Sequence, residues 1–119
     1  MTIEQLLTRN LHEVFGEGDA DRRRAVAEEI FAEDVVFHGP KGSTYRGREA
    51  IVEMAGVVRA SHPTFAYTET APAKANADSG MVAWVSGPPG EPPRYAGVDF
   101  ILAREGKITA IYLFLDGEG

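Results

Sequence analysis

One carboxylate, Asp99, stands inside a long apolar segment that runs from Tyr95 to Arg104. Side chains alternate along a strand, so Asp99 shares one face with Tyr95 and Ile101, and both faces of this strand are largely apolar. Such neighbours disfavour the charged form, so we expect a raised pKa for Asp99. A raised pKa beside a cavity is typical of a general acid, a general base or a hydrogen-bond donor. The alternative is a structural carboxylate that bonds a neighbouring hydroxyl or Arg94.

His38 is the second candidate for proton transfer, because histidine titrates near neutral pH. It ends a short strand-forming segment, where a register change of one residue moves a side chain from pocket to surface. The alternative is an edge histidine that caps loop backbone. His12 and His62 are interpreted as a helix-surface and a helix-end residue. The three histidines lack metal-ligand spacing and the chain has no cysteine, so we predict no metal.

The wall of a pocket around Asp99 is expected to be mainly apolar. Trp84 should face away from Met81 and Val85 and pack in the core or in a dimer interface rather than against a substrate. Tyr45 lies in a polar loop near the expected mouth, where it could gate the pocket or bond a ligand. The predicted substrate-binding residues are Phe37, Tyr45, Met54, Met81, Val85, Tyr95, Ile111 and Leu113.

Three helices followed mainly by strands should position these residues. Apolar residues at helical spacing predict a first helix between Thr2 and Gly16, a second that begins after Asp19 and ends at Glu33-Asp34, and a third between Gly47 and His62. Strands are predicted at 35–37, 65–70, 81–86, 94–104 and 107–116, with a polar loop at 41–47. Helices segregated from a mainly antiparallel meander indicate an α+β fold in which helices cover one face of a curved sheet.

The turn between the last two strands decides which residue lies opposite Asp99. A three-residue turn with Gly106 in the left-handed conformation would pair Asp99 with Ile111 and place Tyr112 on the outer face. A two-residue Glu105-Gly106 turn would instead pair Asp99 with Tyr112. We favour the three-residue turn.

Composition excludes several classes of function. The 119 residues fit one domain, 1–119, and the formal net charge of −6 disfavours nucleic acid as a partner. The triplet Arg22 to Arg24 is surrounded by acidic residues and is interpreted as a solvated helix face. The N-terminus lacks the features of a secretory leader, and no apolar run approaches the roughly 20 residues of a membrane span. We therefore expect no membrane association and a cytoplasmic location.

The chain resembles the SnoaL-like branch of the nuclear transport factor 2-like superfamily, whose members include relatives of ketosteroid isomerase, limonene epoxide hydrolase and polyketide cyclases. The resemblance rests on the sequence G-R-E-A-I at 47–51 and on the strands YAGVDFILAREGKITAIYLFLD at 95–116. It implies a cone-shaped, curved antiparallel sheet wrapped around three N-terminal helices, also described as cystatin-like. It further implies a pocket at the wide end, no cofactor, dimerisation through the outer sheet face, and an acid or base role for Asp99.

Other catalytic positions of these relatives do not carry over. The position of the isomerase base is Gly39, and that of the isomerase tyrosine falls near Leu11. The arginine of the epoxide hydrolases corresponds to Gly97, and their second aspartate falls near Leu113. Neither complete catalytic set is therefore present.

Two kinds of function remain open at this point. The leading hypothesis is a cofactor-independent enzyme that uses Asp99, with or without His38, for isomerisation, cyclisation or ring opening of a small apolar molecule. The alternative is a non-catalytic module of the same fold that binds a small molecule or mediates dimerisation. We expect a homodimer through the outer sheet face, with its apolar residues at the interface: Trp84, Val98, Phe100, Tyr112 and Phe114.

Overall fold

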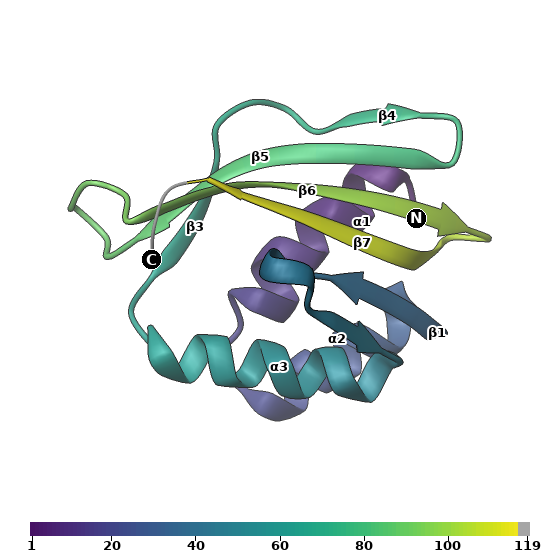
Figure 1. Cartoon of the computed structure of the whole chain (residues 1–119), viewed down its shortest axis with the longest axis horizontal. Helices are drawn as coiled ribbons and strands as arrows, with labels where there is room; N and C mark the ends of the chain where they lie inside the picture. The colour runs from purple at the N-terminus through teal and green to yellow at the C-terminus, as the bar shows by residue number, and fades with distance from the viewer. Residues whose placement is uncertain (117–119) are drawn as a thin grey trace.

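The computed structural model describes residues 1–116 and consists of a curled sheet with helices on its inner side (Figure 1). The helical elements are α1 Ile3–Arg9, the π-helix η1 Asn10–Phe15, α2 Ala20–Ile30, the 3-10 turn η2 Pro40–Gly42, and α3 Arg48–Ser61. The strands are β1 Phe31–His38, β2 Thr44–Arg46, β3 Ala66–Glu69, β4 Lys74–Asn76, β5 Ser79–Gly87, β6 Tyr95–Arg104 and β7 Lys107–Asp116. The predicted α+β class is confirmed.

The seven strands form one sheet in the order β2-β1-β7-β6-β5-β3, with β4 paired to β5 beyond this path. The pairs are antiparallel except β1 with β7, which run parallel. The sheet is thus mixed at one point, although the expected antiparallel β5–β6–β7 meander is present. Its inner face packs against the helices to form the buried core, and α1 contacts β5 while α3 contacts β1 and β2.

Local sequence signals set the helix ends as predicted. Thr2 caps α1 through a capping box with Gln5, and Asp19 caps α2 by accepting hydrogen bonds from the backbone of the first turn. The first helical segment ends at Gly16, and α3 is flanked by Gly47 and His62. Within the first predicted helix, the segment beyond Arg9 is the π-helix η1.

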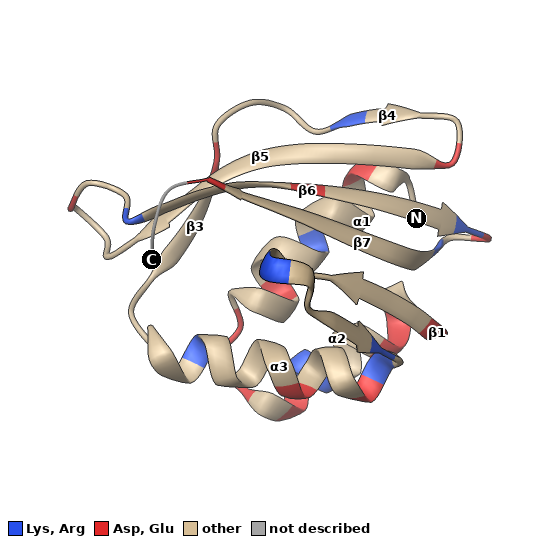
Figure 2. Ribbon diagram, in the orientation of Figure 1, with Lys and Arg blue, Asp and Glu red and all other residues tan. Residues whose placement is uncertain are grey.

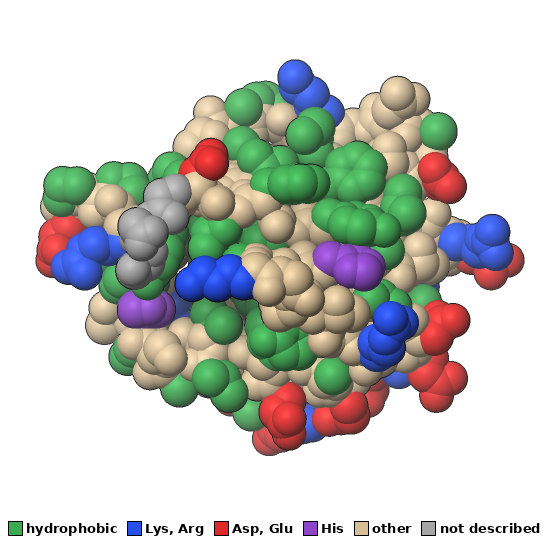
Figure 3. Space-filling model, in the orientation of Figure 1, with side chains coloured by type: hydrophobic (Ala, Val, Ile, Leu, Met, Phe, Trp, Pro, Cys, Tyr) green, Lys and Arg blue, Asp and Glu red, His purple; other side chains and the backbone are tan. Residues whose placement is uncertain are grey.

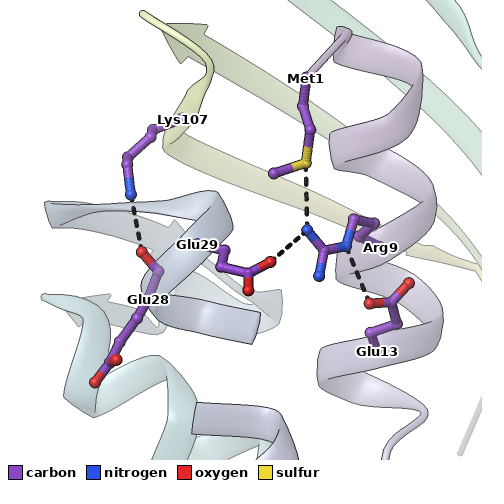
Figure 4. Close-up of polar contacts among 6 residues, drawn as sticks. All are labelled: Met1, Arg9, Glu13, Glu28, Glu29 and Lys107. Atoms are coloured by element: carbon purple, nitrogen blue, oxygen red, sulfur yellow. Dashed lines mark hydrogen bonds and ion pairs between the residues drawn. The ribbon is translucent and has the colours of Figure 1, made fainter. Parts of the chain in front are cut away.

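Polar contacts join α1, η1, α2 and the start of β7 (Figure 4). Arg9 lies between Glu13, at 3.0 Å, and Glu29, at 2.8 Å, and Lys107 donates to the backbone oxygen of Glu28 at 2.8 Å. Because these side chains remain in contact with solvent, such ion pairs contribute little stability each. They fix the orientation of α2 relative to α1 rather than carrying the core.

The second helix was predicted to end at Glu33-Asp34, and this is wrong. It ends at Ile30, and β1 begins at Phe31, which already has an extended backbone and pairs with Ile108 of β7. Phe31 fits the apolar spacing of α2, but it is the first residue of β1, and its side chain is fully buried there. The predicted loop at 41–47 also contains a short strand, β2, which pairs with the end of β1.

The interpretation of Arg22 to Arg24 as a wholly solvated face is also wrong, because Arg23 is buried. Its guanidinium donates to the backbone oxygens of Val14, at 3.3 Å, and Glu17, at 2.6 Å. Carbonyls at the end of a helix lack partners within the helix, so Arg23 satisfies them and joins the end of η1 to α2.

The β6–β7 hairpin differs from both predicted registers. Glu105 and Gly106 form a two-residue turn in which both φ angles are positive, as in type I′ turns, and Arg104 pairs with Lys107. A bulge follows, so that Asp99 pairs with Leu113 instead of Ile111 or Tyr112. Because the bulge adds one residue to β7, Leu113 shares the inner face with Asp99, as expected for a three-residue turn. Tyr112 lies on the outer face opposite Phe100.

Candidate functional site

A cavity of about 360 Å³ lies between the inner face of the sheet and the helices. Its helical wall is mainly apolar, and the side chains that face this wall come from β3, β5, β6 and β7 together with β1 and β2. The helical residues are Leu11, Phe15, Met54, Val57, Val58, Arg59 and Ser61, and the sheet residues are Phe37, Tyr45, Tyr67, Trp84, Ser86, Tyr95, Asp99, Leu113 and Leu115. A cavity of this size and composition suits a small, mostly apolar molecule.

Asp99 lies on the cavity wall, midway along β6. Figure 2 shows that most charged residues of the chain lie on the helices and near strand ends or turns. Its side chain is 6% exposed and stands between Val82 of β5 and Leu113 of β7. Burial raises the pKa of the Asp99 carboxyl to about 6. The direction agrees with the sequence prediction, and desolvation of the charged form is the cause.

Trp84 lies beside Asp99 on the inner face because β6 offers it space at Gly97, its partner across the β5–β6 ladder. A side chain at Gly97 would bring its Cβ within 2.8 Å of the Trp84 ring. The indole Nε1 has no hydrogen-bond partner of ordinary geometry among residues 1–116. It is still near enough to the Asp99 carboxylate to lower the Asp99 pKa slightly, which partly offsets the effect of burial.

Tyr67 of β3 is a second residue of the cavity wall whose pKa is shifted. Burial raises the pKa of the Tyr67 hydroxyl to about 12, and the nearby charge of Asp99 acts in the same direction, whereas Arg59 opposes both. The ring packs edge-on against Trp84 with centroids 5.1 Å apart. Tyr67 therefore keeps its proton at neutral pH and can act there as a hydrogen-bond donor. The sequence analysis did not single it out.

The mouth of the cavity is formed where α3 ends and β6 begins. The Tyr95 hydroxyl and His62 Nε2 are 3.2 Å apart, and the His62 ring stacks on Phe65 with centroids 4.4 Å apart. His62 was interpreted only as a helix-end residue, but it lines the cavity. Its place immediately before a proline marks the end of α3, and nothing in the local pattern indicated what lay beyond that end.

The structure brings six of the ten predicted site residues to the cavity wall: Phe37, Tyr45, Met54, Tyr95, Asp99 and Leu113. Their roles in binding or catalysis stay predictions. Arg94, offered as a structural partner for Asp99, lies instead over the Phe65 ring at 5.9 Å and faces Glu91 at 3.9 Å.

The other four predicted site residues lie elsewhere. His38 is on the outer face, stacked on Tyr112 with ring centroids 4.6 Å apart, because the alternation of β1 turns Phe37 inward. Ile111 is fully buried in the core and does not reach the cavity. Met81 and Val85 were placed on the wrong side of the sheet, since they pair with Phe100 and Ala96 of the outer face.

Trp84 was correspondingly expected on the outer face beside Val98, and this placement is wrong. The β5–β6 register pairs Trp84 with Gly97 and Ala83 with Val98, so the indole points inward and is only 7% exposed. The connection at 88–94 contains four prolines and does not reveal its register from sequence. A register difference of one residue reverses both faces of β5.

No group of three or more histidine, cysteine, aspartate or glutamate side chains in residues 1–116 is arranged to hold a metal ion. None of the helices in this range is long and apolar enough to cross a membrane.

Comparison with known proteins places this geometry in context. A family model described as SnoaL-like domain matches residues 8–111. A search of curated protein sequences finds no match. Among solved structures, a proposed isomerase of the SnoaL-like family from Agrobacterium tumefaciens superposes with a TM-score of 0.87 at 22% identity, over 98% of this chain and 100% of that chain.

Two other solved structures resemble the chain less closely. A proposed ketosteroid isomerase from Kribbella flavida has a TM-score of 0.73 at 19% identity, over 98% of this chain and 79% of that one. A proposed SnoaL-like polyketide cyclase from Jannaschia sp. CCS1 has a TM-score of 0.73 at 17% identity, over 98% and 89%. Further neighbours are described as cystatin-fold or nuclear transport factor 2-like proteins. Identities this low establish a shared fold, and the predicted cystatin-like, cone-shaped fold is thereby confirmed.

Proposed function

The chain belongs to the SnoaL-like domain family, and from this premise we propose that it is a cofactor-independent enzyme that transfers protons on a small apolar molecule. The reaction would be an isomerisation, a cyclisation or an epoxide opening. Asp99 is the proton-transfer group. The observation that carries the proposal is the Asp99 carboxyl, buried in the wall of an apolar cavity with a pKa of about 6.

The protonation state of Asp99 sets the direction of the chemistry. Above pH 6 the carboxylate predominates, and it can remove a proton from a carbon next to a carbonyl group. The electron pair of the broken C–H bond then moves onto the carbonyl oxygen. The Asp99 carboxylic acid so formed returns the proton to a different carbon, which completes an isomerisation and regenerates the carboxylate.

Two donors beside Asp99 suit the negative oxygen that forms during this step. The Tyr67 hydroxyl stays protonated because its pKa is about 12, and the Trp84 indole N–H lies beside the Asp99 carboxyl without a hydrogen bond of ordinary geometry among residues 1–116. Donors fixed in a water-poor cavity stabilise developing charge more than water does, because they need no reorganisation. In this proposal Asp99 moves the proton while Tyr67 and Trp84 hold the oxygen.

The second candidate is a ligand-binding module without turnover. It is favoured by the position of His38, which lies outside the cavity and so cannot share proton transfer with Asp99. The two candidates differ in one respect that does not require the natural substrate. A proton-transfer enzyme exchanges carbon-bound hydrogen of a bound ketone with solvent, whereas a binding module does not.

The experiment is therefore deuterium exchange, measured by proton NMR in D₂O with apolar ketones such as 2-tetralone and cyclohex-3-enone. We expect hydrogen next to the carbonyl group to exchange faster with the wild-type protein than in buffer alone. With the Asp99→Asn variant, the exchange rate should equal that in buffer. Binding of the ketones without any acceleration would favour the module.

We further propose that the protein forms a homodimer through the outer face of the sheet. Figure 3 shows hydrophobic side chains gathered over the strands β5, β6 and β7. Met81 and Phe114 of this face are 41% and 63% exposed, and Phe100 packs edge-on against Tyr112 between them. Exposed apolar patches of this kind mark contact sites. Trp84, placed in this interface by the sequence analysis, is excluded from it.

A charge placed in this patch is expected to separate the subunits. Sedimentation equilibrium at tens of micromolar should give a dimer for the wild type and a monomer for Phe114→Arg, because burying an unpaired guanidinium is costly. Ala60→Arg adds the same charge at an exposed position of α3 and should stay dimeric. A monomeric wild type would contradict the proposal.

A further inference from the structure

Arg59 of α3 differs from the other arginines of residues 1–116 in its position. It lines the cavity and is only partly exposed, and its Nη1 donates to the backbone oxygen of Phe65. No carboxylate within residues 1–116 lies within 4.0 Å of its guanidinium. Its remaining N–H groups are thus available at the wall of an apolar cavity.

The other arginines show how this chain treats guanidinium groups elsewhere. Arg9, Arg24 and Arg94 face carboxylates, with N to O distances of 2.8 to 3.9 Å. Arg23 and Arg48 donate to backbone oxygens at helix and strand ends. Among the described residues, Arg59 is the arginine that lines the cavity, and no carboxylate neutralises it there, so a negatively charged ligand could do so.

The surroundings of Arg59 favour a negative group at the mouth. His62 and Tyr95 line the cavity with it, and Arg94 lies over the Phe65 ring at the same rim. Arg94 is exposed, and its nearest carboxylate is Glu91 at 3.9 Å. Two guanidinium groups, those of Arg59 and Arg94, therefore lie beside Phe65 at this rim, although the chain as a whole is acidic.

The wall of the cavity at the level of Asp99 would repel a negative group. Asp99 and Tyr95 share the inner face of β6 four residues apart, which corresponds to roughly 13 Å along a strand. An ionised Asp99 would stand close to any anion bound at its level, whereas Arg59 and the rim would attract one. A ligand with one negative end and an apolar body would therefore enter with its body toward Asp99 and its charge at the mouth.

We propose that the cavity takes an apolar monocarboxylic acid, whose carboxylate is bound by the Arg59 guanidinium at the mouth and whose apolar body extends toward Asp99. This inference rests on the proposed function in that it takes the cavity to be the ligand site. Arg59 is a specificity-determining residue in this arrangement, because it contacts the ligand but not the reacting atoms. Guanidinium groups bind carboxylates with two parallel hydrogen bonds, which fixes the orientation of the ligand as well as its charge.

The test compares two probes of equal shape, 4-phenylbutanoate and the neutral 4-phenylbutanamide, at pH 7.5. The single tryptophan of the chain, Trp84, lies in the cavity wall, so its fluorescence reports binding without a label. The wild type should bind the carboxylate about tenfold more tightly than the amide, as expected for a charge-assisted hydrogen bond. Arg59→Gln should lose this preference with unchanged affinity for the amide, and Arg59→Lys, which keeps the charge, should retain most of it.

Each remaining outcome contradicts the inference in a distinguishable way. Equal affinity for the two probes in the wild type, or a preference that persists in Arg59→Gln, would overturn the role of Arg59 while leaving the cavity and Asp99 chemistry intact. Failure of both probes to bind would overturn the inference together with the ligand site that the proposed function assumes. Far-ultraviolet circular dichroism melts of the Arg59 variants should match the wild type, so that a loss of preference is not a loss of fold.

Discussion

Replacing Asp99 with asparagine is expected to abolish proton transfer and to make the protein more stable. Loss of a positioned general base lowers the rate by about 10² to 10⁴-fold. The substitution keeps the shape of the side chain and removes its titration. At pH 7 the free energy of unfolding should rise by up to about 3 kcal/mol, because a carboxylate that is costly to bury has been removed. Deuterium exchange and thermal melts measure the two effects.

The combination of these two effects separates a functional Asp99 from a structural one. A structural carboxylate would be held by several hydrogen bonds, and its replacement would lower the melting temperature. In the structure, the donor identified as acting on its pKa is the Trp84 indole, and Arg94 lies elsewhere. Asp78→Asn, at an exposed turn position, is the matched control and should change neither quantity. A marked destabilisation by Asp99→Asn would contradict the catalytic assignment.

The second large effect is a loss of stability between about pH 4 and pH 6.5 that depends on Asp99. The pKa of this carboxyl is raised in the folded state, to about 6 from a reference value of 3.8. The folded protein therefore holds the proton over a range in which the unfolded chain has released it. Stability from this group is complete below pH 4 and is lost as the pH rises through 6, by about 3 kcal/mol in total.

Urea denaturation of the wild type and of Asp99→Asn at several pH values measures this contribution. The informative quantity is the difference in free energy of unfolding between the two proteins at each pH. Carboxylates with lowered pKa values, Asp19 and Glu49 among them, stabilise the fold more as the pH rises, and they contribute equally to both proteins. The free energy of unfolding of the wild type should approach that of the variant below pH 4 and fall beneath it above pH 6. Parallel curves across this range would show that Asp99 titrates normally.

Much of the fold could be predicted because its determinants are local. The capping residues Thr2 and Asp19 mark helix starts through side-chain bonds within one turn. Apolar spacing locates the helices, and alternation locates β6 and places Asp99 among apolar neighbours. The raised pKa of Asp99 followed from this alternation alone, since burial on both faces of a strand is enough to disfavour a charge.

The faces of the neighbouring strands could not be predicted, because they depend on register between segments. The bulge near Thr109 shifts the partner of Asp99 to Leu113, and the proline-rich connection before Arg94 hides the register that turns Trp84 inward. Trp84, Met81 and Val85 were assigned to the wrong faces for this reason. Gly97 was a usable signal, because a glycine opposite a tryptophan can make room for the ring.

Tyr67 and His62 were missed because the local sequence does not show which way either side chain points. Tyr67 sits on the four-residue strand β3, and only its pairing with Ser86 reveals that it faces the cavity. His62 lies one residue past the end of α3, where chain direction is set by packing against Phe65 and Tyr95. Both positions depend on contacts between residues distant in sequence.

A titration of the Asp99 carboxyl group by carbon-13 NMR, assigned by comparison with Asp99→Asn, measures its pKa without a substrate. We predict a midpoint at about pH 6, because the carboxyl faces an apolar cavity beside Trp84 and is withdrawn from water. A midpoint at or below the reference value of 3.8 would show a solvated or ion-paired carboxylate, and would contradict the proposal that this group is poised for proton transfer near neutral pH.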